Sequence, residues 1–291
     1  MQQHLQPKET GGWKTARFLL QRPRFQRTGR TRPLIMGVVN LTPDSFSDGG
    51  RLLSLSAAVD HARQLLDEGA DILDVGGEST RPGAPDVPVE EEWRRVCQVI
   101  EELVKWNVPL SLDSLKPEIM ERALDMGVDI LNDVTGFQSQ RAQRLLSCSQ
   151  AGAVIMHMQG SPRSMQLNPE YADCVAEVQG FLKNTLQTLT QQGVSSERVL
   201  VDPGFGFGKT LEHNVALFAA IPDFSQLGAG VLVGVSRKSM IGQLLDRKDP
   251  LQRIHGSIQA AVVAAGKGAA VLRVHDVRAT LDALIVNDSL I

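Results

Sequence analysis

The segment Gly69-Ala-Asp-Ile-Leu-Asp74 recurs in three variants along the chain, and this repeated joint decides the expected fold. The variants are Gly127-Val-Asp-Ile-Leu-Asn132, Gly152-Ala-Val-Ile-Met-His157 and Gly268-Ala-Ala-Val-Leu-Arg273. Each begins with a glycine, which suits the left-handed residue that ends a helix. Each continues as a short apolar run, which is typical of a strand buried on both faces, and closes on a polar side chain. The pattern therefore predicts helices that each lead into a buried strand.

The segments around these joints complete an alternation of helices and strands. Ser56 is predicted to cap a helix that ends at Gly69, and Pro117 suits the first position of another helix. Four further apolar runs bring the expected strands to eight, namely Leu34–Val39, Pro109–Leu112, Val199–Val201 and Val231–Val235. Eight such units in about 260 residues predict an α/β protein with a single-domain (β/α)8 TIM barrel.

A doubly wound parallel sheet is the alternative architecture for such an alternation. The first strand, however, leads into Asn40-Leu-Thr-Pro43 rather than into the glycine-rich turn that a dinucleotide-binding fold uses. The barrel is therefore the favoured interpretation.

Charge divides the 291 residues into a basic lead-in, residues 1–33, and a barrel domain, residues 34–291. The lead-in holds eight of the 30 basic residues and one of the 33 acidic residues, so the remainder has a net charge of −10. A basic arm can bind nucleic acid, but this acidic body would repel phosphate, so we expect no nucleic-acid partner. The lead-in is expected to be solvated or to form a hairpin over the bottom of the barrel.

Composition also bears on location. The three cysteines, Cys97, Cys148 and Cys174, form no C-x-x-C pair, which argues against a disulfide framework and fits a reducing compartment. No apolar run approaches the roughly 20 residues of a membrane span, and the first residues do not resemble a secretory signal. A cytoplasmic protein with no membrane partner is expected.

Polar side chains follow all of the expected strands. In chain order they are Asn40, Asp74, Asp113, Asn132 with Asp133, His157, Asp202, Ser236 with Arg237 and Lys238, and Arg273 with His275. In a (β/α)8 barrel these positions share the C-terminal face, where active sites form. Any one of them has an ordinary structural explanation, such as a helix cap, a turn or a satisfied core polar group. Eight strands that all end this way are better explained by a polar site.

The chemistry of this rim suggests a ligand. Asp113, Asn132 and Asp202 offer acceptors that suit a flat heterocycle with N–H donors arranged in a fork. Arg81, Arg273 and His275 offer donors to an anion such as phosphate. We therefore expect a ligand with a guanidine-like edge and an anionic group.

The spacing of motif residues tests for two other kinds of site, a nucleotide-binding loop and a metal site. The loop from Asp202 to Thr210 ends in Gly-Lys-Thr, but a Walker A loop needs a glycine where this chain has Pro203, so a nucleotide hydrolase is not expected. The six histidines form no H-E-x-x-H pair, which disfavours a zinc site. A hard cation such as Mg²⁺, bridged by phosphate oxygens, would need only one or two oxygen ligands from the protein.

Several segments resemble the dihydropteroate synthases, and the resemblance runs from about Leu34 to about Thr280. They are Ile35–Gly50, Asp74–Ala84, Asp202–Lys209, Ser236–Ser239 and Arg273-Val-His275. Two departures are mild: Asp113 is followed by Ser where the family commonly has Thr, and Asn132-Asp-Val is followed by Thr where Ser is frequent. Both keep the functional side chains, and the first 30 residues fall outside the motifs.

The resemblance implies roles residue by residue. Pterin binding falls to Asp113, Asn132, Met156, Asp202, Lys238 and Arg273; diphosphate binding to Asn40, Thr80, Arg81, Arg273 and His275; and p-aminobenzoate binding to Phe46, Pro82, Phe207, Lys238 and Ser239. Asn40 is similar to the family's Mg²⁺ ligand, and Lys238, Arg273, His275 and Asp113 resemble the catalytic set. The loops Leu41–Gly50 and Gly76–Asp86 resemble mobile loops that close over the substrates, and the family implies a homodimer.

The implied activity is a transferase reaction in folate synthesis. It condenses (7,8-dihydropterin-6-yl)methyl diphosphate with p-aminobenzoate to give 7,8-dihydropteroate and diphosphate. A methyltetrahydrofolate:corrinoid methyltransferase-like enzyme and a non-catalytic pterin-binding paralogue are the alternatives. The methyltransferase needs neither the diphosphate-binding residues nor the Asn40–Gly50 loop, and a paralogue would be expected to lose some of Asn40, Arg81, Lys238 or His275.

Overall fold

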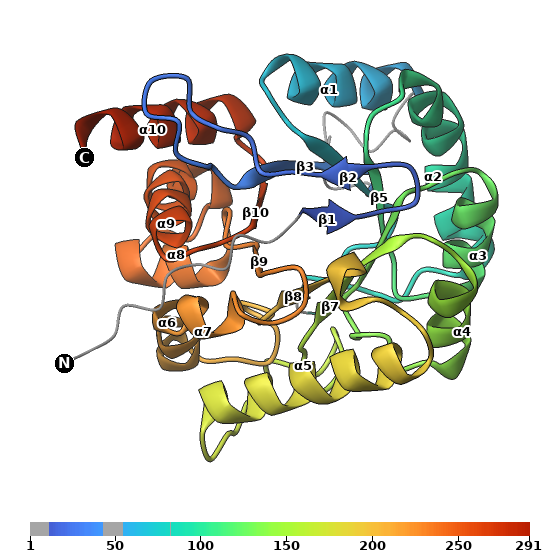
Figure 1. Cartoon of the computed structure of the whole chain (residues 1–291). Helices are drawn as coiled ribbons and strands as arrows, with labels where there is room; N and C mark the ends of the chain where they lie inside the picture. Colours follow the sequence, from blue (N-terminus) through green and yellow to red (C-terminus); the bar gives the residue numbers. More distant parts are fainter. Residues whose placement is uncertain (1–11, 43–54, 82) are drawn as a thin grey trace.

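A barrel of eight parallel strands, surrounded by helices, forms the body of the molecule (Figure 1). The computed structural model describes residues 12–42, 55–81 and 83–291. The strands pair in the order β8-β7-β6-β5-β4-β3-β10-β9, and a parallel bridge between Val201 and Val231 joins the two ends of this sheet. The predicted (β/α)8 barrel is confirmed, and the doubly wound alternative is not.

The elements alternate along the chain as predicted. The barrel strands are β3 Leu34–Asn40, β4 Ile72–Gly76, β5 Leu110–Asp113, β6 Ile130–Asp133, β7 Gly152–Met156, β8 Val199–Asp202, β9 Leu232–Val233 and β10 Val271–Val274. The helices are α1 Leu55–Asp67, α2 Val89–Leu103, α3 Pro117–Asp125, α4 Gln140–Cys148, α5 Cys174–Gln191, α6 Leu211–Ala219, α7 Ile221–Phe224, α8 Ser239–Leu245, α9 Ile254–Gly266 and α10 Val277–Leu290.

Two apolar layers hold the barrel together, and the period of two in each strand separates them. Leu34 and Met36 of β3 belong to a cluster that fills the interior near the start of the strands. Ile35 and Val39 of the same strand belong to a larger cluster between the sheet and its helices. The strands are therefore buried on both faces, as their apolar runs predict.

Three of the four repeated joints have the predicted backbone, and one does not. Gly69, Gly127 and Gly268 have φ of 104°, 97° and 98°, in the left-handed region. Gly152 is instead the first residue of strand β7. The absence of a side chain at this position permits close packing, because a Cβ there would lie 3.1 Å from Thr15 Cγ2 and 3.2 Å from the Lys14 carbonyl oxygen.

The predicted helix starts have mixed outcomes. Pro117 is the first residue of α3, as predicted. Ser56 is not a cap, because α1 begins at Leu55 and Ser56 lies in its first turn, where its hydroxyl lies 3.3 Å from Asp60 Oδ2. The run predicted over Val231–Val235 yields only the two-residue strand β9, since its sheet pairing stops before Gly234.

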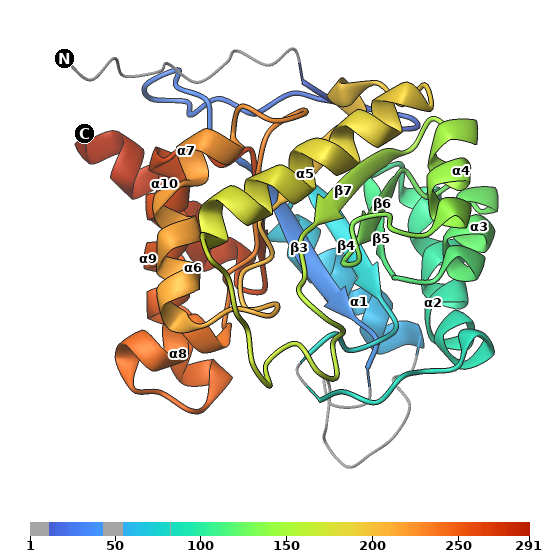
Figure 2. The ribbon, with the colours of Figure 1, turned by 90° about the horizontal axis from the view of Figure 1, so that it is seen from below.

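The end of the lead-in forms a hairpin on the barrel. Strands β1 Trp13–Lys14 and β2 Leu19–Leu20 pair antiparallel, and Figure 2 shows them across the end from which the barrel strands start. The Trp13 indole donates to the Arg198 carbonyl oxygen at 2.9 Å, and Arg17 pairs with the buried Asp129 carboxylate at 2.7 Å. The expected hairpin over the barrel bottom is confirmed, and the division at residue 33 stays a prediction.

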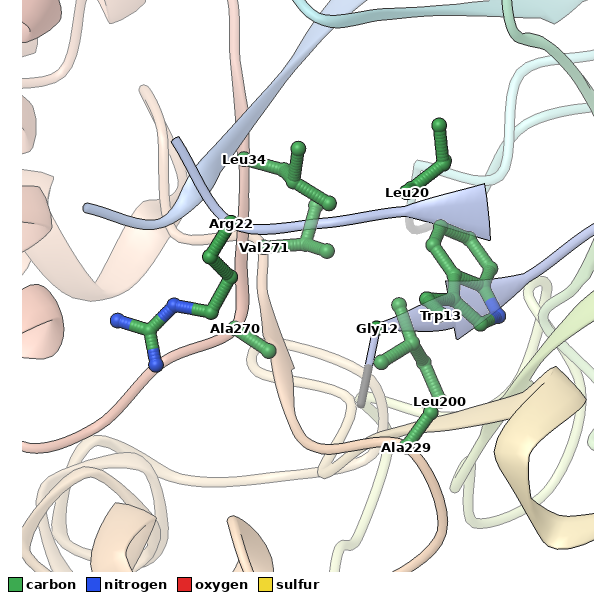
Figure 3. Close-up of a pocket in the computed structure, with 9 residues that line it drawn as sticks. All are labelled: Gly12, Trp13, Leu20, Arg22, Leu34, Leu200, Ala229, Ala270 and Val271. Atoms are coloured by element: carbon green, nitrogen blue, oxygen red, sulfur yellow. The ribbon is translucent and has the colours of Figure 1, made fainter. Parts of the chain in front are cut away.

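A small pocket lies beneath this hairpin (Figure 3). It is lined by Gly12, Trp13, Leu20, Arg22, Leu34, Leu200, Ala229, Ala270 and Val271. Most of these side chains are apolar, and they surround the first residues of the barrel strands. This end of a (β/α)8 barrel contributes stability rather than catalysis, so the pocket is not the candidate site.

Within the described residues, no helix is long and apolar enough to cross a membrane.

Candidate active site at the C-terminal rim of the barrel

The inward-facing positions change from apolar to polar toward the C-terminal rim. Five rim residues lie two positions after an interior apolar residue, so they face the same way. They are Asp74, Asn132, Met156, Asp202 and Arg273, which follow Ile72, Ile130, Val154, Leu200 and Val271. The strand period therefore brings residues from five strands to one end of the barrel, as predicted from the strand ends.

An ion-paired group lies at the centre of this rim. The Arg273 Nε atom donates to Asp74 Oδ2 at 2.6 Å, and its Nη2 atom donates to Asp113 Oδ2 at 2.7 Å. The Asn132 amide lies 3.4 Å from the Asp74 carboxylate. Asp74 is fully buried and so needs such a cation. Asp74 orients Arg273, a role that the strand-end pattern did not assign to it.

Asp113 has the chemistry of a ligand-binding group. Its Oδ1 atom is buried and has no hydrogen-bond partner among the described residues. Burial raises the pKa of Asp113 to about 7, although the Arg273 charge opposes that rise. A buried acceptor without a donor is costly, so this oxygen suits a ligand N–H group.

Asp202 and Lys238 add a second pair of opposite charges to the rim. Asp202 is buried, which raises its carboxyl pKa, and its Oδ1 atom accepts from the Gly204 N–H at 2.7 Å. Lys238 donates to the Phe205 carbonyl oxygen at 2.8 Å, and its ammonium lies 4.7 Å from the centre of the Phe207 ring. Burial lowers the pKa of Lys238 to about 8, while the Asp202 charge raises it. The two groups thus interact electrostatically.

An apolar wall borders these charges. Met156 and Phe207 pack with Val134 and Met165, and Leu115 and Met158 adjoin them. Sequence reasoning singled out Met156 and Phe207 and missed the other four. Val134 directly follows a polar strand end, which is a weak signal, whereas Met165 lies in a loop with no motif of its own. A wall of this kind beside a fork of acceptors suits a flat heterocycle.

The predicted anion-binding residues occupy a neighbouring part of the rim. His275 Nδ1 lies 3.0 Å from the Ser236 hydroxyl oxygen, and burial lowers the His275 pKa to about 3, with the Arg273 and Arg81 charges adding to this effect. His275 is therefore a neutral imidazole near pH 7. Arg81 is exposed and Thr80 is half-buried in the loop after β4.

Asn40 ends strand β3, where it pairs in register with Gly76 of β4. Its half-buried side chain offers an amide oxygen at the rim, a ligand type that suits Mg²⁺. No group of three or more His, Cys, Asp or Glu within the described residues could hold a metal ion. A single amide oxygen fits a hard cation that takes its other ligands from water and from a substrate.

The predicted p-aminobenzoate residues are described only in part. Phe207 is buried, Lys238 is half-buried beside it, and Ser239 is exposed at the start of α8. Phe46 and Pro82 lie outside the described residues, as does most of the Leu41–Gly50 loop.

Three polar residues near the strand ends have structural partners instead. Asp133 is buried and accepts from Thr135 and Phe137 backbone N–H groups, both at 2.8 Å. His157 Nδ1 lies 3.0 Å from the buried Lys209 ammonium. Arg237 Nε donates to Asp276 at 3.0 Å. For these residues the ordinary structural explanation holds.

The barrel, its polar rim and the apolar wall define an enzyme that binds a flat heterocycle at the C-terminal face. The "Pterin binding enzyme" family model matches residues 36–275. A dihydropteroate synthase of Neisseria meningitidis serogroup C is 51% identical over 92% of this chain and 96% of its own length.

Two solved structures agree with this match. The Xanthomonas albilineans dihydropteroate synthase with 4-aminobenzoic acid has a TM-score of 0.84 and 48% identity, over 93% of this chain and 98% of that chain. The Burkholderia cenocepacia dihydropteroate synthase complexed with 7,8-dihydropteroate has a TM-score of 0.84 and 44% identity, over 96% and 95% of the two chains. This chain belongs to the pterin-binding enzymes and, within them, to the dihydropteroate synthase family.

Proposed function

We propose that this chain joins (7,8-dihydropterin-6-yl)methyl diphosphate to p-aminobenzoate, releasing diphosphate and 7,8-dihydropteroate. The observation that carries the proposal is the buried, unpartnered Oδ1 atom of Asp113, held beside Arg273 and next to an apolar wall. A pterin ring presents N–H donors on one edge and two flat faces. The fork of acceptors and the wall match both features.

Different residues are proposed to bind the pterin ring and the diphosphate. Asp113, Asn132 and Asp202 hold the pterin edge, while Met156 contacts a face of the pterin ring. Arg273, His275, Thr80 and Arg81 bind the diphosphate, whose negative charge grows as the C–O bond to the pterin methylene breaks. The neutral His275 contributes as a hydrogen-bond donor rather than as a charge.

The second substrate approaches from the side of Lys238. Phe207, Lys238 and Ser239 are proposed to surround the p-aminobenzoate, together with Phe46 and Pro82. Its amine attacks the methylene carbon, a C–N bond forms, and the amine then loses one proton to water or to the departing diphosphate. An aryl amine is neutral near pH 7, so no general base is required.

Mg²⁺ is the proposed cofactor, with Asn40 as its protein ligand. A divalent cation would neutralise diphosphate charge in the transition state. Because Asn40 is a single neutral ligand, the affinity for Mg²⁺ alone should be weak and should rise when diphosphate is present. Calorimetric titration of Mg²⁺ with and without diphosphate tests this, and equal affinity in the two titrations would count against the assignment.

Turnover of the purified protein with both substrates tests the function directly. We expect 7,8-dihydropteroate to form, and Lys238→Ala to lower kcat/KM by about 10²–10³-fold, as for loss of one transition-state donor. Lys183→Ala, an exposed lysine of α5, is the control and should match the wild type. Absence of turnover, with pterin binding retained, would favour the non-catalytic paralogue. Methyl transfer from methyltetrahydrofolate would favour the corrinoid alternative.

We also propose a homodimer, a cytoplasmic location, and no membrane or nucleic-acid partner. Helices α8 to α10 lie on one side of the barrel in Figure 1, and Leu244, Ile285 and Val286 on them are 57%, 46% and 55% exposed. Burying exposed apolar side chains in an interface is favourable, which supports association through this side. Val286→Glu should therefore reduce the mass measured by sedimentation to that of a monomer. An unchanged mass would place any dimer contact elsewhere.

A further inference from the structure

We propose that Lys116, Glu78 and Glu92 form a positioning cluster that fixes the loop bearing Thr80 and Arg81 for diphosphate binding. The inference rests on the proposed diphosphate role of that loop. It assigns a task to three charged residues that do not belong to the predicted site.

The cluster is held by charge and is largely buried. The Lys116 ammonium pairs with Glu78 and, at 2.6 Å, with Glu92. The side chains of Lys116, Glu78 and Glu92 are only 15%, 9% and 0% exposed. The second Glu92 oxygen accepts from the Ser114 hydroxyl at 2.6 Å. A buried carboxylate without its cation is strongly disfavoured, so this arrangement is well defined.

Glu78 closes the base of the loop. Its Oε1 atom accepts from the Val87 N–H at 2.9 Å, nine residues further along the chain. Beside it, the Gly77 carbonyl oxygen accepts from Arg95 of α2 at 2.8 Å. The space at Gly77 is also tight, because a Cβ there would lie 2.8 Å from Val96. Arg95 of α2 therefore holds the start of the loop at Gly77, and the Glu78 carboxylate holds its end at Val87.

Lys116 connects this base to the pterin side of the rim. It lies at the start of α3, three residues after Asp113, and its backbone N–H donates to the Ser114 hydroxyl at 3.2 Å. The loop that carries Arg81 is therefore anchored to the strand end that carries Asp113. An anion bound by Arg81 and a ring bound by Asp113 are held at a set separation, and small misplacements of reacting groups can cost about 10²-fold in rate.

Glu78→Ala is the sharpest test because it releases the loop and leaves the Lys116–Glu92 pair next to Asp113. We expect the affinity for inorganic diphosphate, measured by calorimetry with Mg²⁺ present, to fall by about 10- to 100-fold. The affinity for 6-hydroxymethylpterin, which lacks diphosphate, should change by less than about twofold. KM for the pterin diphosphate should rise accordingly, while KM for p-aminobenzoate should change little.

Three further variants make the result decisive. Glu78→Gln keeps an acceptor for the Val87 N–H and should recover part of the lost diphosphate affinity; it also serves if Glu78→Ala does not fold. Glu90→Ala removes an exposed carboxylate of α2 that pairs with Arg122 of α3, and should behave as the wild type. Arg81→Ala reports on the anion contact itself.

The outcomes separate the two proposals. If Arg81→Ala weakens diphosphate binding and Glu78→Ala does not, the positioning cluster is refuted while the diphosphate role of the loop stands. If neither variant weakens diphosphate binding, both the positioning cluster and the diphosphate role of the loop are refuted. Equal loss of diphosphate and pterin affinity in Glu78→Ala would mean that the cluster only supports the fold.

Discussion

Burial moves the pKa values of Asp113 and Lys238 in opposite directions. It raises the Asp113 pKa to about 7 and lowers the Lys238 pKa to about 8, because removal from water disfavours either charge. Both groups are needed in their charged forms if Asp113 is to accept from the pterin and Lys238 is to attract an anionic substrate. The pH range in which both are charged is therefore narrow.

This predicts a bell-shaped dependence of kcat/KM on pH, with its maximum between about 7 and 8. Below that range Asp113 binds a proton and loses its negative charge, and above it Lys238 loses its positive charge. Steady-state assays between about pH 5 and 10 would map both limbs of this pH profile. In Asp113→Asn the acidic limb near 7 should disappear, at much lower activity. An acidic limb that survives unchanged in this variant would assign it to another group.

At the level of elements, close contact between the lead-in hairpin and strand β7 depends on Gly152. The hairpin backbone passes so near that a Cβ would sit 3.2 Å from the Lys14 carbonyl oxygen and from Trp13 Nε1. Gly152 is not a left-handed residue, so its role is steric rather than conformational.

Gly152→Ala is therefore expected to destabilise the protein by about 1–3 kcal/mol, the usual cost of overpacking. Gly180→Ala is the matched control, since it lies inside α5 and a Cβ there meets nothing within 4 Å. It should stabilise the protein by about 0.5–1 kcal/mol, because alanine favours a helix over glycine. Chemical unfolding measures the free energy of unfolding of both variants. Equal stability of the two would show that the hairpin can move away from the added methyl group without a loss of stability.

In the whole molecule, the contacts that stabilise the fold and the residues proposed to bind substrates lie at opposite ends of the barrel axis. The hairpin and its apolar contacts lie at the N-terminal end, and the charged rim lies at the other. All substrate contacts are therefore expected at one end, where the loop with Thr80 and Arg81 adjoins strands that carry the pterin residues.

This arrangement predicts ordered binding of the second substrate. A sulfonamide, which presents the same aryl amine as p-aminobenzoate, should bind well only after pterin and diphosphate are in place, because the anion then orders Arg81 beside the second pocket. Calorimetry with a sulfonamide, alone and with pterin, Mg²⁺ and diphosphate, measures the difference. We expect at least about a tenfold gain, which corresponds to 1.4 kcal/mol. Equal affinity in both conditions would exclude this coupling.

Local sequence determined the elements of this protein and the kinds of residue at its rim. Gly69 and Gly127 end helices because glycine tolerates positive φ, and Pro117 starts one because its own φ is preset. Apolar runs with a period of two then place Asp202 and Asn132 at a common end. These signals act within a few residues of the chain, so they can be recognised without the fold.

Only the tertiary structure decided which of the rim residues meet. Arg273 reaches Asp74 and Asp113 across 199 and 160 residues of chain, which no local pattern specifies. Met165 joins the apolar wall from a loop, and Gly152 is required by a hairpin more than a hundred residues away. Closure of the barrel creates these contacts by burial and ion pairing between distant segments. The sequence by itself therefore determined the elements, their order and the chemistry at the rim, whereas the structure decided which rim residues pair and which serve the fold.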